Sequence, residues 1–248
     1  MSSSLAIFAQ HALTLFLIVG IPLWDLYEIP RLKASTDPRK KIRYYAKIGA
    51  VSWVLAAMGC LLVGFGPVFG IHYAPAELAW MAAGTRVRMI LLGACVGAAA
   101  AIATPAVIAI WSAKLRVKAA KAAQRLSFLL PSSGDERRWW IGVCVTAGVC
   151  EEIIYRGFLL HYFHASPLHL SLTWALAASS IVFGIGHLYQ GATGAVSTVV
   201  VGFLLGVVFL VTGSLMVPMI AHALLDLRIL LMLPEGFAAA EGKGLAKT

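Results

Sequence analysis

Apolar residues occupy most positions of this chain and come in runs long enough to cross a bilayer, which takes about 20 helical residues. Short breaks that contain Gly, Pro or Ser separate consecutive runs in the second half of the chain. The pattern therefore predicts an all-α fold, a polytopic transmembrane helical bundle. We expect about seven spans, at residues 5–23, 48–69, 89–111, 139–165, 170–188, 192–212 and 215–233.

Prolines and glycines inside these runs predict how the helices bend and pack. Pro105 and Pro218 lie within expected spans and should bend them, because proline removes a helical hydrogen bond. The first run has no basic residue before it and is too long for a signal-peptide core, so we expect it to be retained. Small-xxx-small spacing, which allows close helix packing, occurs at Gly93 with Gly97 and at Gly202 with Gly206.

The composition supports the membrane class. The chain has 248 residues, of which 60% are apolar and 12% charged, whereas soluble domains have about 45–50% apolar and about 25% charged residues. Disordered, collagen-like and disulfide-stapled secreted proteins are excluded by the same numbers. All four cysteines lie inside apolar stretches without metal-type spacing, which indicates small buried side chains.

The net charge of +9 is concentrated in two basic segments, residues 31–47 and 114–138. No aromatic-basic interleaving or nucleic-acid motif accompanies this charge, so we expect no nucleic-acid partner. The positive-inside bias of membrane proteins accounts for it instead. The helical hairpin between the second and third spans would put both segments on the same, cytoplasmic side.

Residues 113–128 differ from the apolar spans. Lys114, Lys118, Lys121 and Arg125 recur at steps of four, three and four, so they share one helical face. This pattern predicts an amphipathic helix that lies at the membrane interface and contacts anionic lipid headgroups. A solvated basic helix with no lipid role is the alternative.

Charged residues occur inside the fourth expected span, where they are expensive and therefore candidates for function. Glu152 and Arg156 are four residues apart on one helical face and can pair. Glu151 is turned about 100° away, which leaves its carboxylate for another role. A buried ion pair that only fixes packing would explain Glu152 and Arg156 but not Glu151.

Two histidines and an aspartate occupy the later spans. His187 ends the fifth span, and His222 and Asp226 are four residues apart on one face of the seventh. Counted along the helix from the span ends at residues 165 and 170, Glu151 lies about 21 Å deep and His187 about 26 Å deep. Counted from residue 215, His222 lies only about 10 Å deep. A meeting of the three therefore needs a deep Gly213–Ser214 turn or the bend at Pro218. Such groups can act as a general base, a proton carrier and oxyanion donors.

Three motifs carry a resemblance to the CPBP family, which comprises type II CAAX prenyl endopeptidases and bacterial bacteriocin-processing and immunity proteins. They are Glu151-Glu152-x-x-x-Arg156, Phe183-x-x-x-His187 and His222-x-x-x-Asp226. Singly these motifs are short, but all three in order on membrane helices are specific. The resemblance covers residues 139–233.

The resemblance implies an intramembrane endopeptidase with its site in a cavity between helices. Glu151 and His187 would activate water, with Glu151 as the base, and His222 and Asp226 would stabilise the oxyanion. Glu152 and Arg156 would shape the site. The eukaryotic prenyl endopeptidases have asparagine where this chain has Asp226; an ionised aspartate cannot donate a hydrogen bond, so Asp226 is expected to orient His222 or to be protonated.

Other functions stay open from the sequence. A zinc-dependent version of the protease is chemically possible, but no His-Glu-x-x-His helix is present, and we expect no metal or other cofactor. A non-catalytic immunity or binding protein, or a proton-coupled transporter, is a third reading. No inverted repeat of the kind that transporters use is visible.

We therefore expect three parts: an N-terminal membrane region (1–138), a four-helix catalytic core (139–233) and a cytoplasmic tail (234–248). The protein is expected to be a multi-pass protein of a bacterial cell membrane, with its basic loops and C-terminus cytoplasmic. Its expected partners are a peptide or protein substrate at the membrane and anionic lipid headgroups; the sequence does not specify an oligomeric state.

Overall fold

A computed structural model describes residues 3–70, 85–109, 111–165 and 168–233. The regular elements in these ranges are helices, and an isolated bridge joins Gly70 to Ser214. The first half contains α1 (Ser3–Leu15), the π-helical η1 (Phe16–Gly20), α2 (Ile21–Ala34), α3 (Lys40–Val63), α4 (Phe65–Phe69), α6 (Thr85–Ala109), α7 (Ala113–Ala123) and the 3-10 turn η2 (Gln124–Leu126). The second half contains α8 (Gly134–Glu152), the π-helical η3 (Ile153–Leu159), α9 (Leu160–His164), α10 (Leu172–Ile185), the 3-10 turn η4 (Leu188–Gln190), α11 (Ala192–Thr212), α12 (Met216–Leu227) and α13 (Ile229–Met232).

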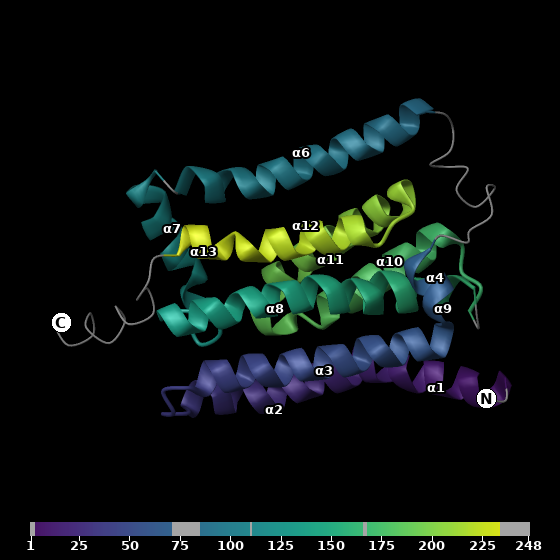
Figure 1. Cartoon of the computed structure of the whole chain (residues 1–248), viewed down its shortest axis with the longest axis horizontal. Coiled ribbons are helices and arrows are strands. Elements are labelled where there is room, and N and C mark those ends of the chain that lie inside the picture. The colour runs from purple at the N-terminus through teal and green to yellow at the C-terminus, as the bar shows by residue number, and fades with distance from the viewer. Residues whose placement is uncertain (1–2, 71–84, 110, 166–167, 234–248) are drawn as a thin grey trace.

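The helices run roughly side by side along the long axis of the molecule (Figure 1). Helices α1, α2 and α3 lie along one edge, α6 along the opposite edge, and the second half of the chain between them. Three helices in the described ranges are long and apolar enough to cross a membrane: Ser4–Ala34, Lys40–Val63 and Ala192–Thr212. The fold is therefore all-helical and that of an integral membrane protein.

The first membrane helix is longer than the expected span, which was to end at residue 23. Elements α1, η1 and α2 form one helical rod that continues to Ala34. Pro22 does not end it, and the π-helical turn η1 lies just before this proline, where the regular α-helical hydrogen bonding is already interrupted.

Helix α3 ends at Val63, before residue 69, at which the second span was expected to end. Gly64 has φ +92°, a backbone conformation that glycine adopts without steric strain. The chain turns there, and α4 holds the Gly66-Pro67 pair inside a short helix.

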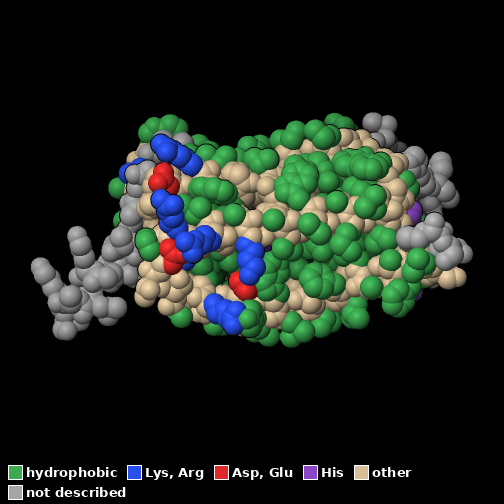
Figure 2. Space-filling model, turned by 60° about the horizontal axis from the view of Figure 1, so that its bottom comes forward, with side chains coloured by type: hydrophobic (Ala, Val, Ile, Leu, Met, Phe, Trp, Pro, Cys, Tyr) green, Lys and Arg blue, Asp and Glu red, His purple; other side chains and the backbone are tan. Residues whose placement is uncertain are grey.

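Both basic segments lie at the same end of the molecule. The α2–α3 turn, α7 and the start of α8 meet at the left of Figure 1. Figure 2 shows Lys and Arg side chains gathered near that end, and hydrophobic side chains over much of the remaining face.

Helix α7 has the two-sided character that its sequence predicts. Ser112 caps its N-terminus by accepting a hydrogen bond from the Leu115 N–H. Ala120 and Ala123 pack against the apolar cluster around Trp140. Helix α7 itself ends at Ala123 and a 3-10 turn follows, so the α-helix is shorter than the expected 113–128. The four predicted basic residues, Lys114, Lys118, Lys121 and Arg125, are all exposed.

Glycines let the helices of the second half approach closely. A Cβ atom at Gly202 would lie 2.7 Å from the Phe183 ring, and one at Gly206 would overlap the Leu176 side chain. The packing role predicted for this pair is therefore confirmed. At Gly93 and Gly97, no atom of a described residue lies within 4 Å of a Cβ, so the described part of the chain shows no such contact there.

Candidate functional site

Helix α8 is fixed at its start by a buried polar cluster. Ser133 and Glu136 form a capping box, and Lys41 Nζ lies 3.5 Å from Glu136 Oε2 and donates to the Leu130 carbonyl. Burial raises the pKa of Glu136, but hydrogen bonds from the Ser132 N–H and hydroxyl and the charge of Lys41 outweigh it and hold that pKa below its usual value. The start of α8 is thereby tied to α3.

At the other end of α8, Glu152 and Arg156 form the predicted ion pair. Arg156 Nη1 lies 2.9 Å from Glu152 Oε1, and neither side chain has any exposed surface. Arg156 Nη2 donates to the Gly202 carbonyl of α11 at 2.8 Å. The guanidinium also lies 4.6 Å from the centre of the Phe183 ring. Arg156 therefore connects three helical segments through one side chain.

His222 is held by the same carboxylate oxygen. Its Nδ1 lies 2.8 Å from Glu152 Oε1, and because a carboxylate only accepts, Nδ1 is the donor. Its Nε2 lies 3.8 Å from Glu151 Oε2 and 3.7 Å from Asp226 Oδ2, beyond hydrogen-bond length. The hydrogen bond that orients His222 is thus accepted by Glu152, and Asp226 lies near the ring without a hydrogen bond to it.

Close packing of α12 on α8 brings His222 to this depth. A Cβ atom at Gly148 would lie 2.8 Å from the Met219 carbonyl oxygen and 2.9 Å from the Ala223 nitrogen. A larger residue at this position would push the two helices apart. Because α12 lies directly against α8, His222 reaches Glu152 although the sequence placed the two residues at different depths in the membrane.

His187 lies just beyond α10 and not inside it, as the expected span to residue 188 implied. The helix ends at Ile185, and His187 precedes the turn η4. Its Nδ1 donates to the Phe183 carbonyl at 2.8 Å. Because Nδ1 carries the proton, Nε2 of a neutral ring keeps a lone pair free to accept.

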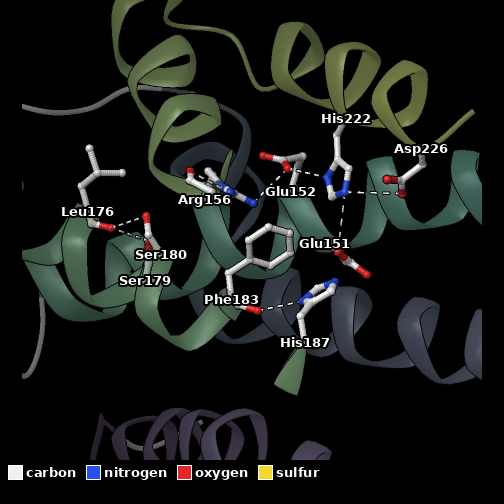
Figure 3. Close-up of polar contacts among 11 residues, drawn as sticks. Glu151, Glu152, Arg156, Leu176, Ser179, Ser180, Phe183, His187, His222 and Asp226 are labelled. Carbon is white, nitrogen blue, oxygen red and sulfur yellow. Dashed lines mark hydrogen bonds and ion pairs between the residues drawn. The ribbon is translucent and has the colours of Figure 1, made fainter. Parts of the chain in front are cut away.

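The Phe183 ring lies at the centre of the cluster (Figure 3). Its centroid is 4.7 Å from that of His187 and 5.7 Å from that of His222, both edge to face. The sequence placed Phe183 only as the first letter of a motif, although its spacing of four from His187 puts it one turn away. The Gly202 carbonyl that binds Arg156 has no sequence signal at all.

Glu151 is the neighbouring carboxylate that takes no part in the Glu152–Arg156 ion pair. Its side chain is 23% exposed, whereas that of Glu152 is fully buried. Its Oε2 has no hydrogen-bond partner in the described part of the chain. Figure 3 shows this carboxylate turned away from Arg156, on the side where His187 lies. No ion pair joins Glu151 directly to His187 among the described residues, so any link between them needs a bridging molecule.

A separate apolar cavity of about 720 Å³ lies between α3, α4, α8 and α12. Its lining includes Trp53, Phe65, Val149 and Met219, and none of the six candidate site residues. The cavity and the polar cluster are therefore distinct features of the molecule.

The comparisons with known proteins agree with this cluster. Residues 135–228 match the family model described as type II CAAX prenyl endopeptidase Rce1-like, a range that contains all six candidate residues. This part of the chain is similar to the Rce1-like family. The Rce1-like family is a protease family, and the resemblance seen in the three motifs is confirmed at this level. No curated protein and no solved structure matches the chain.

Proposed function

We propose that this protein is an intramembrane endopeptidase that hydrolyses a peptide bond of a membrane-associated or prenylated substrate. The observation that carries the proposal is the unequal treatment of two adjacent carboxylates. Glu152 is fully buried and its Oε1 accepts hydrogen bonds from both Arg156 and His222, whereas the Glu151 side chain is 23% exposed and forms no ion pair with any described arginine. An unpaired carboxylate next to two imidazoles is what a general base requires.

In the proposed reaction, Glu151 takes a proton from a water molecule that His187 helps to position. His187 Nε2 accepts a hydrogen bond from this water because Nδ1 is committed to Phe183. The water oxygen attacks the scissile carbonyl carbon, and the proton passes to the departing amine as the C–N bond breaks. His222 Nε2, which faces Glu151, contributes to stabilising the oxyanion.

Two residues act through His222. Glu152 fixes the ring by its hydrogen bond to Nδ1, and Arg156 holds Glu152 in place. Asp226, 40% exposed and 3.7 Å from Nε2, favours the protonated ring electrostatically when ionised.

The proposal includes no metal. In the described part of the chain, no three His, Cys, Asp or Glu side chains converge in a way that fits a metal ion. A zinc enzyme would lose activity to a chelator and contain stoichiometric zinc by elemental analysis. The metal-free mechanism predicts full activity after chelation and no bound zinc.

We further propose seven membrane spans, with the N-terminus outside and the basic loops and C-terminal tail in the cytoplasm of a bacterial cell. The shared end of the basic segments supports this orientation. The exposed basic face of α7 would contact anionic lipid headgroups there. Accessibility of single cysteines to a membrane-impermeant thiol reagent tests the topology.

Cleavage of a quenched peptide panel, prenylated and unprenylated, tests the activity. The wild type should cleave at least one class, and Glu151→Gln and His187→Ala should abolish cleavage while still inserting and folding. His11→Ala is the matched control, because His11 contacts Tyr162 away from the cluster. Unchanged turnover in Glu151→Gln would end the proposal. Proton flux in proteoliposomes without any cleavage would favour the transporter alternative instead.

A further inference from the structure

The polar cluster around Glu151 has many hydrogen-bond acceptors and few free donors. Arg156 is committed through both Nη atoms, to Glu152 and to the Gly202 carbonyl. His187 Nδ1 donates to a backbone carbonyl, and His222 Nδ1 donates to Glu152. Two donor positions remain: Arg156 Nε, which is buried without a hydrogen-bond partner among the described residues, and His222 Nε2, which faces two carboxylates.

The proposed reaction requires donors at one particular place. Attack of water on a peptide carbonyl develops negative charge on the carbonyl oxygen, and preorganised donors must meet it there. An ionised Asp226 offers only acceptor oxygens. Arg156 Nε is fully buried, so a neutral donor with accessible surface next to His222 Nε2 would be better placed to meet this charge.

Tyr155 has a hydroxyl with the required properties. Tyr155 is only 6% exposed, and its hydroxyl forms no hydrogen bond with any described residue. The hydroxyl oxygen keeps some accessible surface, through which it can donate to a bound molecule. Tyr155 is also four residues after Glu151 in the chain, so both lie on the same side of the α8–η3 helix.

The hydroxyl is directed at the backbone that carries His187. A Cβ atom at Gly186, the residue before His187, would lie 3.1 Å from the Tyr155 oxygen. The Tyr155 ring is held in this direction by Phe183, at 4.8 Å between centroids. Phe183 also contacts both histidines, so one aromatic ring sets the positions of the phenol and the two imidazoles.

We propose that Tyr155 is a further catalytic residue, whose hydroxyl donates a hydrogen bond to the oxyanion of the scissile carbonyl. The inference rests on the proposed endopeptidase function. The hydroxyl keeps its proton throughout, so the step changes no bond of Tyr155: water adds to the carbonyl carbon, its proton goes to Glu151, and the negative oxygen lies between Tyr155 and His222 Nε2. Gly186 leaves room for the hydroxyl.

Turnover of the full-length protein, with the peptide that the wild type cleaves best, tests the inference. Tyr155→Phe should lower kcat about 100-fold, as loss of one oxyanion donor does, with KM changed less than about threefold. Its melting temperature should stay at or above that of the wild type, because an unpaired hydroxyl is removed. Tyr162→Phe is the matched control: Tyr162 is also buried, but its hydroxyl bonds His11, so it should lose stability and keep kcat.

A double-mutant cycle adds a readout that a structural role would not move. Gly186→Ala should lower kcat by crowding the hydroxyl, and it should lower kcat little further in the Tyr155→Phe background. An active wild type with unchanged kcat in Tyr155→Phe would overturn the inference and leave the endopeptidase proposal intact. A wild type that cleaves no peptide would remove both.

Discussion

Replacing Arg156 with methionine should destabilise the protein strongly, because it leaves the Glu152 carboxylate buried without its arginine. Loss of one partner of a buried ion pair costs about 3–5 kcal/mol. We expect the lower limit, about 3 kcal/mol, because His222 keeps its hydrogen bond to Glu152 Oε1. For a chain of 150–250 residues this corresponds to a fall of about 6–12 °C in melting temperature.

Thermal unfolding in detergent micelles measures this change. Arg138→Met is the matched control, because the Arg138 side chain is 84% exposed and its pair with Asp135 is a surface one; its effect should stay within about 0.5 kcal/mol. Glu152→Gln in the Arg156→Met background should recover part of the loss, since the neutral amide oxygen still accepts from His222. A double variant no more stable than Arg156→Met would refute the assigned cost of an unpaired buried carboxylate.

Three further changes test other parts of the account. Gly148→Val should separate α12 from α8, and both the melting temperature and kcat should fall, whereas Gly142→Val, which meets no atom within 4 Å, should leave kcat unchanged. The folded-state pKa of Glu136 lies below its usual value of 4.5. Its contribution to the free energy of unfolding, about 1–2 kcal/mol, is therefore complete above pH 4.5 and is lost as the pH falls through the folded-state pKa. The stability difference between wild type and Glu136→Gln in denaturant titrations should shrink on acidification, and a constant difference would contradict this reasoning. Lys118→Glu with Lys121→Glu should abolish the stabilisation that phosphatidylglycerol, but not phosphatidylcholine, gives the wild type at low salt, and equal stabilisation of both proteins would exclude headgroup binding by α7.

Helix ends were predictable where glycine punctuates an apolar run. Helix α11 spans Ala192–Thr212, the expected range, because Gly191 and Gly213 both adopt positive φ on either side of it. The ends of α2 and α10 were not predictable in this way. Helix α2 continues through polar residues to Ala34, and α10 stops before His187 although the apolar run goes on to Leu188.

Within the candidate site, local spacing was informative and long-range contact was not. The step of four gave the Glu152–Arg156 pair, which is a contact within one helix. The hydrogen bond from His222 to Glu152 joins residues 70 apart and depends on the close approach at Gly148. Such an approach follows from the packing of whole helices, and it cannot be predicted from one glycine among the 23 in the sequence.

The central claim is that Glu151 activates the attacking water, and the single-turnover cleavage rate of Glu151→Gln tests it most directly. Glutamine keeps the shape of the side chain but cannot take a proton at neutral pH, so the rate should fall about 10²–10⁴-fold with substrate binding unchanged. A Glu151→Gln protein that cleaves at the wild-type rate would contradict the claim.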